Sequence, residues 1–417
     1  MKPSRVRLAP TFALLVLCAG RHAAAQLAKP EVHGSAKLTF IKDHAESITD
    51  QQATQYLRLE ASKVFSDKIG FTVDTRNRFE YDQTVAGTTR QDAFNLYQAY
   101  LSLNKLYAGL SFRVGRQYAY SGETAAQFDG AAAEWQSVRW LTLGAFSGKP
   151  VSLMGPALAD DYRGCSVKLG AGIKGYLELA ALVASYQQQY AADRDVQATV
   201  YRRLAPGLDF TGTFSYLNNT PKSASVRVSA YSPEWGLTLT PHYYRHMYVA
   251  DPGSTALSPY ERTLAYTERF DRIGLGLSKY FTRLGLSLGG GSDFTRPDNR
   301  QEYYLSVSLN NLFHAGLELS SFLNYSTQDT RRASSYTVSS GYRLGRSLKL
   351  SAGTSVSRSQ DRAYSDIYGT SMSRTYYSEL KWSRGKNLDV ALSPSIVRSS
   401  AYNSPITRVQ LTNGWRF

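Results

Sequence analysis

Hydrophobic and polar residues alternate one by one along most of this chain. In the stretch GFTVDTRNRFEYD, one face carries Phe71, Val73, Phe79 and Tyr81, and the other carries Thr72, Asp74, Arg76, Arg78, Glu80 and Asp82. A period of two is typical of a β-strand with one apolar and one polar face. The chain is therefore predicted to be all-β.

The length of these segments indicates what the apolar faces contact. They run for about 10–13 residues, which is enough for a tilted strand to cross a bilayer, whereas strands of soluble sheets average about 5–6 residues. Long apolar faces invite aggregation in water but are required in lipid, where only closed sheets satisfy every backbone group. The polar faces are then expected to point into the lumen of a barrel.

Turn signals give the strand number. Ten short turns alternate with eleven longer loops, so we predict about 22 strands, within a range of about 18–24, and both termini on one side of the membrane. One longer loop is expected at residues 119–128, and residues 125–148 are the hardest to divide into strands. The prediction is a transmembrane antiparallel up-and-down β-barrel that occupies residues 26–417 and has no plug domain.

The first 25 residues have the pattern of a cleaved signal peptide. A basic start precedes an apolar stretch at residues 8–19, and small residues at Ala23 and Ala25 suit cleavage before Gln26. The alternative is a lipid anchor on Cys18, although Leu17 stands where that processing prefers a small residue. Either route exports the protein.

Composition narrows the classes of function. The chain has 30 Tyr, 17 Phe and 32 Gly but only 4 Met, a profile that suits aromatic-girdled strands. The net charge of +15 is dispersed, with no run of five basic residues, so nucleic acid is not an expected partner. Beyond the signal only Cys165 remains, which excludes an internal disulfide and a covalently attached c-type haem. No apolar run approaches the 18 or so residues of a transmembrane helix.

The chain ends on an alternating stretch, RVQLTNGWRF. It resembles the C-terminal signature of bacterial outer-membrane proteins at Val409, Leu411, Trp415 and Phe417, and departs from it at Asn413. The resemblance implies that the barrel-assembly machinery of a Gram-negative cell reads these residues and that the last strand closes the barrel against the first. It also implies that outer-membrane lipid surrounds the barrel.

A second stretch, FRVGRQYAYSGETAAQFDG at residues 112–130, resembles a strand–loop–strand of several Gram-negative porins. If Phe112 and Val114 face lipid, Arg113 and Gln117 face the lumen. Gly115 would allow close strand approach. We expect Asp129 and Gly130 to begin the next strand.

Assigning the polar faces inward gives a set of candidate pore-lining residues. They are Arg76, Arg78, Glu80, Arg113, Gln117, Arg203, Arg227, Arg343, Lys349 and Arg408. The excess of arginine favours anions in transit. The alternative is that these charges form solvated pairs with wall acids and have no effect on selectivity.

The sequence offers no catalytic, cofactor or metal site. His242 and His246 are four residues apart, which on a strand is about 13 Å and too far for one metal ion to share. No Ser or Asp is spaced with a base so as to indicate a nucleophile. Cys165 is read as a small wall residue, and an enzyme is not expected.

The expected width leaves two functions open. About 22 strands spaced 4.8 Å and tilted near 40° enclose a backbone cylinder of roughly 44 Å. Loops at residues 247–266 and 148–161 are long enough to constrict it. The first hypothesis is a porin-like channel for small hydrophilic solutes, with anions favoured. The alternative is a sheath around a multihaem cytochrome, similar to the porin-cytochrome conduits, with the haem belonging to that partner.

Overall fold

The structure is a computed structural model. It describes residues 30–417 except 46–47, 65, 84–92, 122–123, 152–158, 173, 187–190, 250–256, 259–260, 262–268, 282–283, 295–299, 313–315, 329–330, 362–369 and 401–403. The expected signal peptide at residues 1–25 lies outside the described residues. Within the described part of the chain, no helix has the length and apolar character needed to span a bilayer.

The described residues form 22 strands. They are β1 (Glu31–Ala45), β2 (Ile48–Ser62), β3 (Ile69–Gln83), β4 (Ala93–Leu103), β5 (Leu110–Ser121), β6 (Thr124–Val138), β7 (Leu141–Pro150), β8 (Asp161–Gly172), β9 (Gly175–Tyr186), β10 (Ala191–Ala205), β11 (Leu208–Leu217), β12 (Thr220–Ser232), β13 (Leu237–His246), β14 (Phe270–Tyr280), β15 (Leu284–Phe294), β16 (Gln301–Leu312), β17 (Leu317–Thr327), β18 (Arg331–Leu344), β19 (Leu348–Asp361), β20 (Thr370–Arg384), β21 (Leu388–Ser399) and β22 (Ile406–Arg416).

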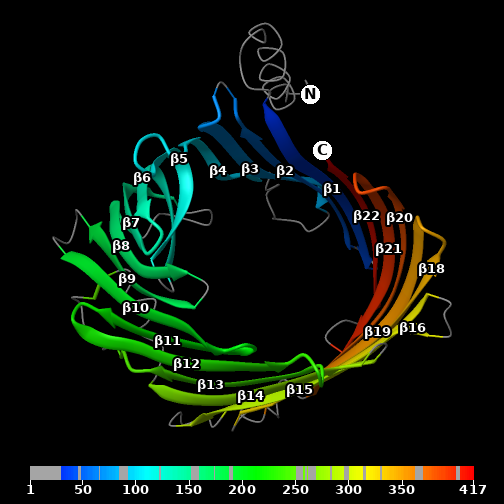
Figure 1. Cartoon of the computed structure of the whole chain (residues 1–417). Coiled ribbons are helices and arrows are strands. Elements are labelled where there is room, and N and C mark those ends of the chain that lie inside the picture. Colours follow the sequence, from blue (N-terminus) through cyan, green and yellow to red (C-terminus); the bar gives the residue numbers. More distant parts are fainter. Residues whose placement is uncertain are drawn as a thin grey trace, which may run out of the picture.

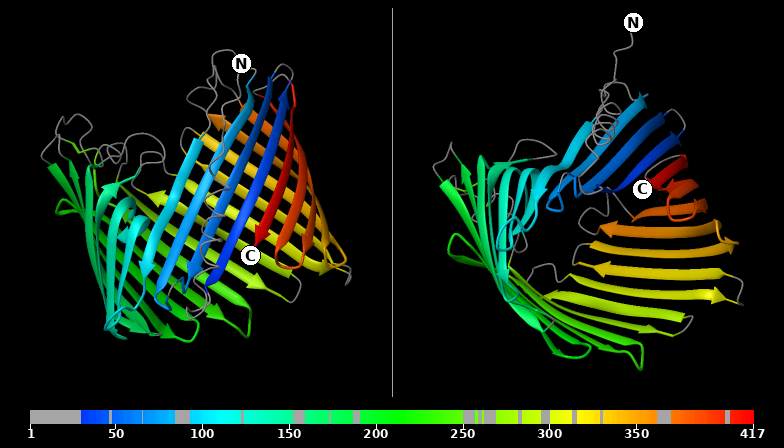
Figure 2. Two further views of the ribbon diagram at one scale, coloured as in Figure 1. Left: turned by 90° about the horizontal axis from the view of Figure 1, so that it is seen from above. Right: turned by 45° about the horizontal axis from the view of Figure 1, so that its top comes forward.

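Each strand pairs antiparallel with its neighbours in the sequence, and β22 returns to pair with β1. The result is a closed ring of strands (Figure 1), and the strands are tilted relative to the barrel axis (Figure 2). The described residues contain no plug domain. The predicted all-β, up-and-down barrel of about 22 strands is confirmed.

Ring closure involves the last residue of the chain. The β1–β22 ladder runs from Ser35 opposite Arg416 to His44 opposite Thr407. Beyond it, the amide of Gly34 donates to the carbonyl of Phe417 at 2.8 Å, and the amide of Phe417 donates back at 3.0 Å. A Cβ on Gly34 would lie 2.6 Å from the Phe417 ring, so the ring occupies the space that this glycine leaves. The C-terminal aromatic is therefore part of the closure.

Two sequence expectations about β5 and β6 were wrong. Residues 119–128 are mostly strand rather than a longer loop, because β5 continues to Ser121 and β6 begins at Thr124. Asp129 and Gly130 lie in the middle of β6 and do not begin it. The glycine and the polar residues there suggested a loop, but cross-strand pairing with β5 and β7 keeps them in the sheet.

Contacts across the ring identify the inner face. Strand β5 contacts β8 and β9, which are not its neighbours, and only the concave side of a closed sheet allows this. The side chains that meet there belong to two adjoining clusters, Ala119, Phe128 and Ala132 with Phe146 and Tyr162, and Ala159, Ala184 and Tyr186 with Tyr162. Residues opposite one another in a ladder share a face, so the registers extend this assignment around the ring.

The outer face carries many exposed apolar side chains. On β1 and β22 it carries Leu38, Phe40 and Leu411, which are 44%, 36% and 46% exposed. Outward positions elsewhere are similar, including Leu275, Leu350 and Leu392. This arrangement suits hydrocarbon and would be unfavourable in water.

Candidate functional site: the inner wall of the barrel

The registers place all ten candidate pore-lining residues on the inner face. The ladders that carry this assignment run from β5 through β22 to β3. Sequence alternation brought these residues to one face because each strand keeps a period of two between its bulges.

Most of the basic residues in this set have an acidic partner. The pairs are Arg78–Glu80 at 2.6 Å, Arg203–Asp209 at 3.2 Å, Arg408–Asp43 at 2.7 Å, and Glu318 with both Arg343 at 3.0 Å and Lys349 at 2.6 Å. Such pairs neutralise the wall locally, and exposed pairs contribute little to stability. The excess of positive charge in the sequence therefore overstates the free positive charge of the lumen.

Three arginines form no ion pair with a described carboxylate. The guanidinium carbon of Arg76 lies 5.4 Å from the centre of the Tyr56 ring, and that of Arg113 lies 5.9 Å from the centre of the Tyr100 ring. Arg227 lines a groove on the opposite part of the wall. An arginine stacked on a ring keeps its charge, so Arg76 and Arg113, like Arg227, are inward cations without an ion pair to a described carboxylate.

Two members of the set hardly reach solvent. Gln117 is 0% exposed, and its amide donates to the carbonyls of Arg113 at 3.2 Å and Gly130 at 3.3 Å. Glu80 is 4% exposed. Gln117 thereby joins β5 to β6, whereas the ion pair of Glu80 with Arg78 lies within β3.

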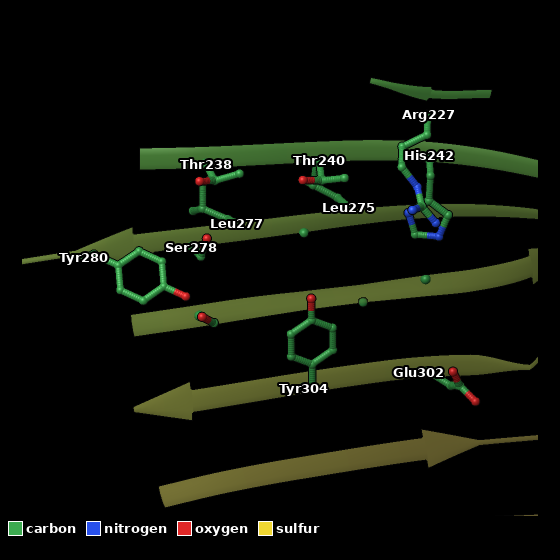
Figure 3. A pocket seen from close by; sticks show the side chains of 14 residues that line it. Arg227, Thr238, Thr240, His242, Leu275, Leu277, Ser278, Tyr280, Glu302 and Tyr304 are labelled. Atoms are coloured by element: carbon green, nitrogen blue, oxygen red, sulfur yellow. The ribbon is translucent and has the colours of Figure 1, made fainter. Parts of the chain in front are cut away.

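A groove of about 490 Å³ runs along the inner wall between β12 and β16 (Figure 3). Its floor has glycines opposite glycines, with Gly274 facing Gly291 and Gly276 facing Gly289. A Cβ on Gly274 would lie 2.1 Å from the His242 ring, and one on Gly289 would lie 2.4 Å from the Tyr304 ring. Both rings therefore lie on glycine backbone, and polar side chains border them: Arg227, Thr238, Thr240, Ser278 and Glu302.

The two histidines of β13 have different surroundings. His242 lies in this groove, whereas His246 is 5% exposed and stacks on Phe270 with ring centres 5.8 Å apart. No group of three His, Cys, Asp or Glu side chains among the described residues has a geometry for a metal ion.

The connection between β13 and β14 is fastened to the rim opposite the chain termini. Glu261 accepts hydrogen bonds from the Tyr248 hydroxyl at 2.6 Å, the Asn218 amide at 3.1 Å and the Ser258 backbone amide at 3.0 Å. The Glu261 amide donates back to the Ser258 hydroxyl at 3.0 Å, which completes a capping box. The spacing of Ser258 and Glu261, Ser-x-x-Glu, was a signal for this capping box that strand periodicity did not reveal.

These hydrogen bonds determine the protonation states of Glu261 and Tyr248. Burial alone would raise the pKa of Glu261, but the hydrogen bonds from Tyr248, Ser258 and Asn218 outweigh it and hold the pKa below its ordinary value. Burial, reinforced by the Glu261 carboxylate, raises the pKa of Tyr248 above its ordinary range. At neutral pH the glutamate is thus charged and the tyrosine protonated.

Under this connection lies a buried polar cluster that the sequence did not indicate. Lys222 and Asp195 form an ion pair at 2.7 Å with side chains 9% and 7% exposed. Asp193 accepts from the Tyr186 hydroxyl at 2.7 Å and from the Asn218 amide at 2.8 Å. Buried charges require such partners. The cluster therefore holds together the part of the wall to which the β13–β14 connection is bound.

The porin-like stretch forms a crease in the wall. Gly115, Gly130 and Gly148 stand side by side on β5, β6 and β7, and a Cβ on any of them would lie within 2.5 Å of a neighbouring backbone atom. Gly115 has φ of 126°, in a region that other residues rarely adopt. Close strand approach at Gly115 is thereby confirmed, and it extends across three strands.

Several solved structures are similar to this chain over most of its length. The translocation pore of the P pilus usher PapC matches with a TM-score of 0.51 and 9% identity, over 92% of this chain and 99% of that chain. Pseudomonas aeruginosa OccK2 (OpdF) matches with a TM-score of 0.45 and 11% identity, over 93% and 98%. A BenF-like porin from Pseudomonas fluorescens Pf-5 gives 0.40 and 10%, over 94% and 99%.

No protein-family model matches the chain, and no curated protein matches it. The likeness to PapC shows a common fold and nothing more, and the other two likenesses are too weak to add to it. The class defined by the fold is a closed, antiparallel, up-and-down β-barrel, with 22 strands among the described residues.

Proposed function

We propose that this chain is an outer-membrane channel through which small hydrophilic solutes pass without chemistry or an energy source. The observation that carries the proposal is the two-sided wall. Outward positions such as Leu38 and Leu411 are apolar and exposed, whereas inward positions carry ion pairs, hydroxyls and glycines. A closed sheet with an apolar exterior and a polar interior meets the requirements of a water-filled passage through lipid.

Anions are the favoured solutes. The paired basic residues of the inner wall, such as Arg408 and Arg203, are neutralised by adjacent acids. This leaves Arg76, Arg113 and Arg227 as inward cations without an ion pair to a described carboxylate. Inward cations in a polar passage raise the local concentration of anions.

Two connections are fastened to the wall at one rim, and in this proposal they narrow the passage there. The β13–β14 connection is held by Glu261 against the wall of β11 and β12, and Ala159 of the β7–β8 connection packs on Ala184 and Tyr186 of β9. These are the two loops expected from their length to constrict the lumen. The rim that they narrow is opposite the chain termini, which is the extracellular rim of an outer-membrane barrel.

Export and assembly follow the same proposal. Residues 1–25 serve as a cleaved signal peptide, and the barrel-assembly machinery reads Val409, Leu411, Trp415 and Phe417. Three of these side chains project from the outer face of β22, and Phe417 lies over Gly34 of β1.

The second candidate function is a sheath around a cytochrome or another protein. It is favoured by the distribution of buried side chains: the fully buried ones among the described residues, Gln117, Phe128, Ser215, Leu217 and Ser223, come from β5, β6, β11 and β12. Other inward residues, among them Glu80 and Asp195, are buried less completely, and a threaded partner would cover the inner surface that remains accessible.

Planar-bilayer conductance of the barrel purified in mild detergent tests the first proposal. Stable channels whose reversal potential favours anions are expected. Replacing Arg76, Arg113 and Arg227 together by alanine should shift the reversal potential toward cations, whereas Arg202→Ala, which removes the same charge from the outer face, should leave it unchanged. A co-purifying haem Soret band and no conductance would favour the sheath, and a selectivity indifferent to the triple change would refute the anion filter.

A further inference from the structure

The ladder between β4 and β5 is the shortest in the barrel. It consists of five pairs, from Leu103 opposite Phe112 to Ala99 opposite Arg116, whereas the next shortest ladders, β7–β8 and β12–β13, have eight. Beyond Ala99, residues 93–98 of β4 and residues 117–121 of β5 do not pair with each other. We call this unpaired half, which lies toward the extracellular rim, the β4–β5 seam.

Two features of the backbone separate the strands at this point. Gly115 of β5, with its φ of 126°, stands next to the last pair, and a Cβ on it would lie 2.2 Å from the carbonyl oxygen of Ala99. On the other side, the register between β3 and β4 shifts at Tyr97, so that Gln98 pairs with Asp74 and Leu96 pairs with Thr75. The seam is therefore built by a crease in one strand and a bulge in the other.

Side chains replace the missing backbone bonds. The carbonyl of Leu96 accepts from the Arg116 guanidinium at 3.3 Å, and the carbonyl of Tyr97 accepts from the Gln127 amide at 2.7 Å. Arg116 is itself held by Asp129 through two bonds of 2.7 Å. An unsatisfied carbonyl in hydrocarbon costs several kcal/mol, and side chains that can rotate away satisfy it reversibly, unlike a strand ladder.

The outer surface at the seam is partly apolar and partly polar, because the Arg116–Asp129 pair and Gln127 also lie on that face. The outward positions of β4 remain apolar through the unpaired half, at Leu96 and at Phe94, which is 65% exposed. On the lumen side, Arg113 stacks over Tyr100 just below the seam and has no ion pair with a described carboxylate. A cation thus stands inside the barrel, and the apolar side chains of β4 stand outside it, beside the Arg116–Asp129 pair.

From these observations we infer that the β4–β5 seam is a lateral passage between the lumen and the bilayer for a single-chain anionic amphiphile of the fatty-acid type. Arg113 holds the carboxylate on the lumen side. The acyl chain lies between β4 and β5 against Leu96 and Phe94. Arg116 and Gln127 close the seam when it is empty, by binding the β4 carbonyls.

A photoreactive probe tests this inference. The full barrel, in a Cys165→Ser background and reconstituted in lipid nanodiscs, is illuminated with a diazirine-bearing palmitate analogue, and the labelled residues are mapped by mass spectrometry. Labelling should concentrate on residues 93–98 and 117–118, and unlabelled palmitate should compete with it. Arg113→Ala should weaken the competition about tenfold, which corresponds to the loss of one charge-assisted hydrogen bond, and Arg113→Lys should restore part of it.

A second variant blocks the seam without disturbing the fold. Tyr118 stands opposite Gln127, whose amide also lies 3.4 Å from the Leu96 carbonyl, so positions 96 and 118 are close. Leu96→Cys with Tyr118→Cys, joined by a short bismaleimide, should abolish labelling of the seam and leave ion conductance intact. Arg227→Ala, which removes an inward cation far from the seam, should not affect labelling.

Labelling spread evenly over the outer face would show that the probe only dissolves in the bilayer, and would overturn the inference. So would the capture of a protein strand on β4 in native membranes, because the seam would then be a docking edge. The labelling does not depend on ion conduction, so its failure is distinguishable from failure of the channel proposal.

Discussion

Replacing Gly115 by alanine tests the crease that shapes this side of the barrel. The new Cβ would lie 2.2 Å from the carbonyl oxygen of Ala99 and 3.0 Å from the α-carbon of Tyr100, and both are backbone atoms of β4. Neither can rotate away as a side chain would. The φ of 126° adds a second penalty, because an L-residue rarely adopts it.

The size of the effect follows from these two terms. A residue held in a sparsely populated backbone region costs about 1–3 kcal/mol, and overpacking of a close contact costs about 1–3 kcal/mol more. Gly115→Ala should therefore lower the free energy of unfolding by about 2–6 kcal/mol, against a typical total of about 5–15 kcal/mol. Since the ladder to β4 has only five pairs, the strain cannot be spread along it.

Urea unfolding of the refolded barrel in detergent, followed by tryptophan fluorescence, measures the difference. Gly414→Ala is the matched control, because a Cβ there meets nothing closer than 4.0 Å and the backbone needs no left-handed conformation. The control should change the unfolding midpoint little. If Gly115→Ala were as stable as Gly414→Ala, the crease would not require glycine, and the reasoning from backbone clash would be refuted.

Three further outcomes are expected. Phe417→Ala should reduce the fraction of heat-modifiable, folded barrel in membranes, because the ring over Gly34 is lost, and Phe417→Tyr should restore it; equal yields for both would count against a role in closure. The pKa of Glu261 is lowered in the folded protein, so the stability that its hydrogen bonds contribute is complete above the ordinary carboxyl pKa of about 4.3 and is lost as pH falls through the lower folded pKa. Protease cleavage of the β13–β14 connection should therefore rise on that acidification. The variant Glu261→Gln should be cleaved already at neutral pH. Lys222→Met leaves Asp195 buried without its cation and should cost about 3–5 kcal/mol, whereas Arg203→Met at an exposed pair should cost less than about 1 kcal/mol in the same unfolding assay.

The alternation of residues was sufficient for the fold class, the strand number and the two faces. Phe71 and Val73 alternate with Asp74 and Arg76 in the sequence, and these residues lie on opposite faces of β3. This works because a strand has a period of two whatever it pairs with. The same regularity placed the candidate lining residues on the inner face.

The alternation of residues could not predict which charged side chains form ion pairs with one another. Arg343 and Lys349 are close in sequence to many polar residues, but their acid is Glu318 on the next strand but one from Lys349, and Arg408 meets Asp43 from the other end of the chain. Register decides these contacts, and register depends on bulges and turns in several strands at once. The sequence therefore overestimated the free cations of the lumen.

What the sequence determined by itself was local and periodic: strands of bilayer-crossing length, short turns at one rim, and an aromatic at the terminus. What the tertiary structure decided was where that regularity is broken. The crease at Gly115, the separation of β4 from β5, the anchor at Glu261 and the buried pair of Lys222 and Asp195 each join residues of different strands. They depend on contacts that exist only once the sheet has closed and its inner surface has folded against itself.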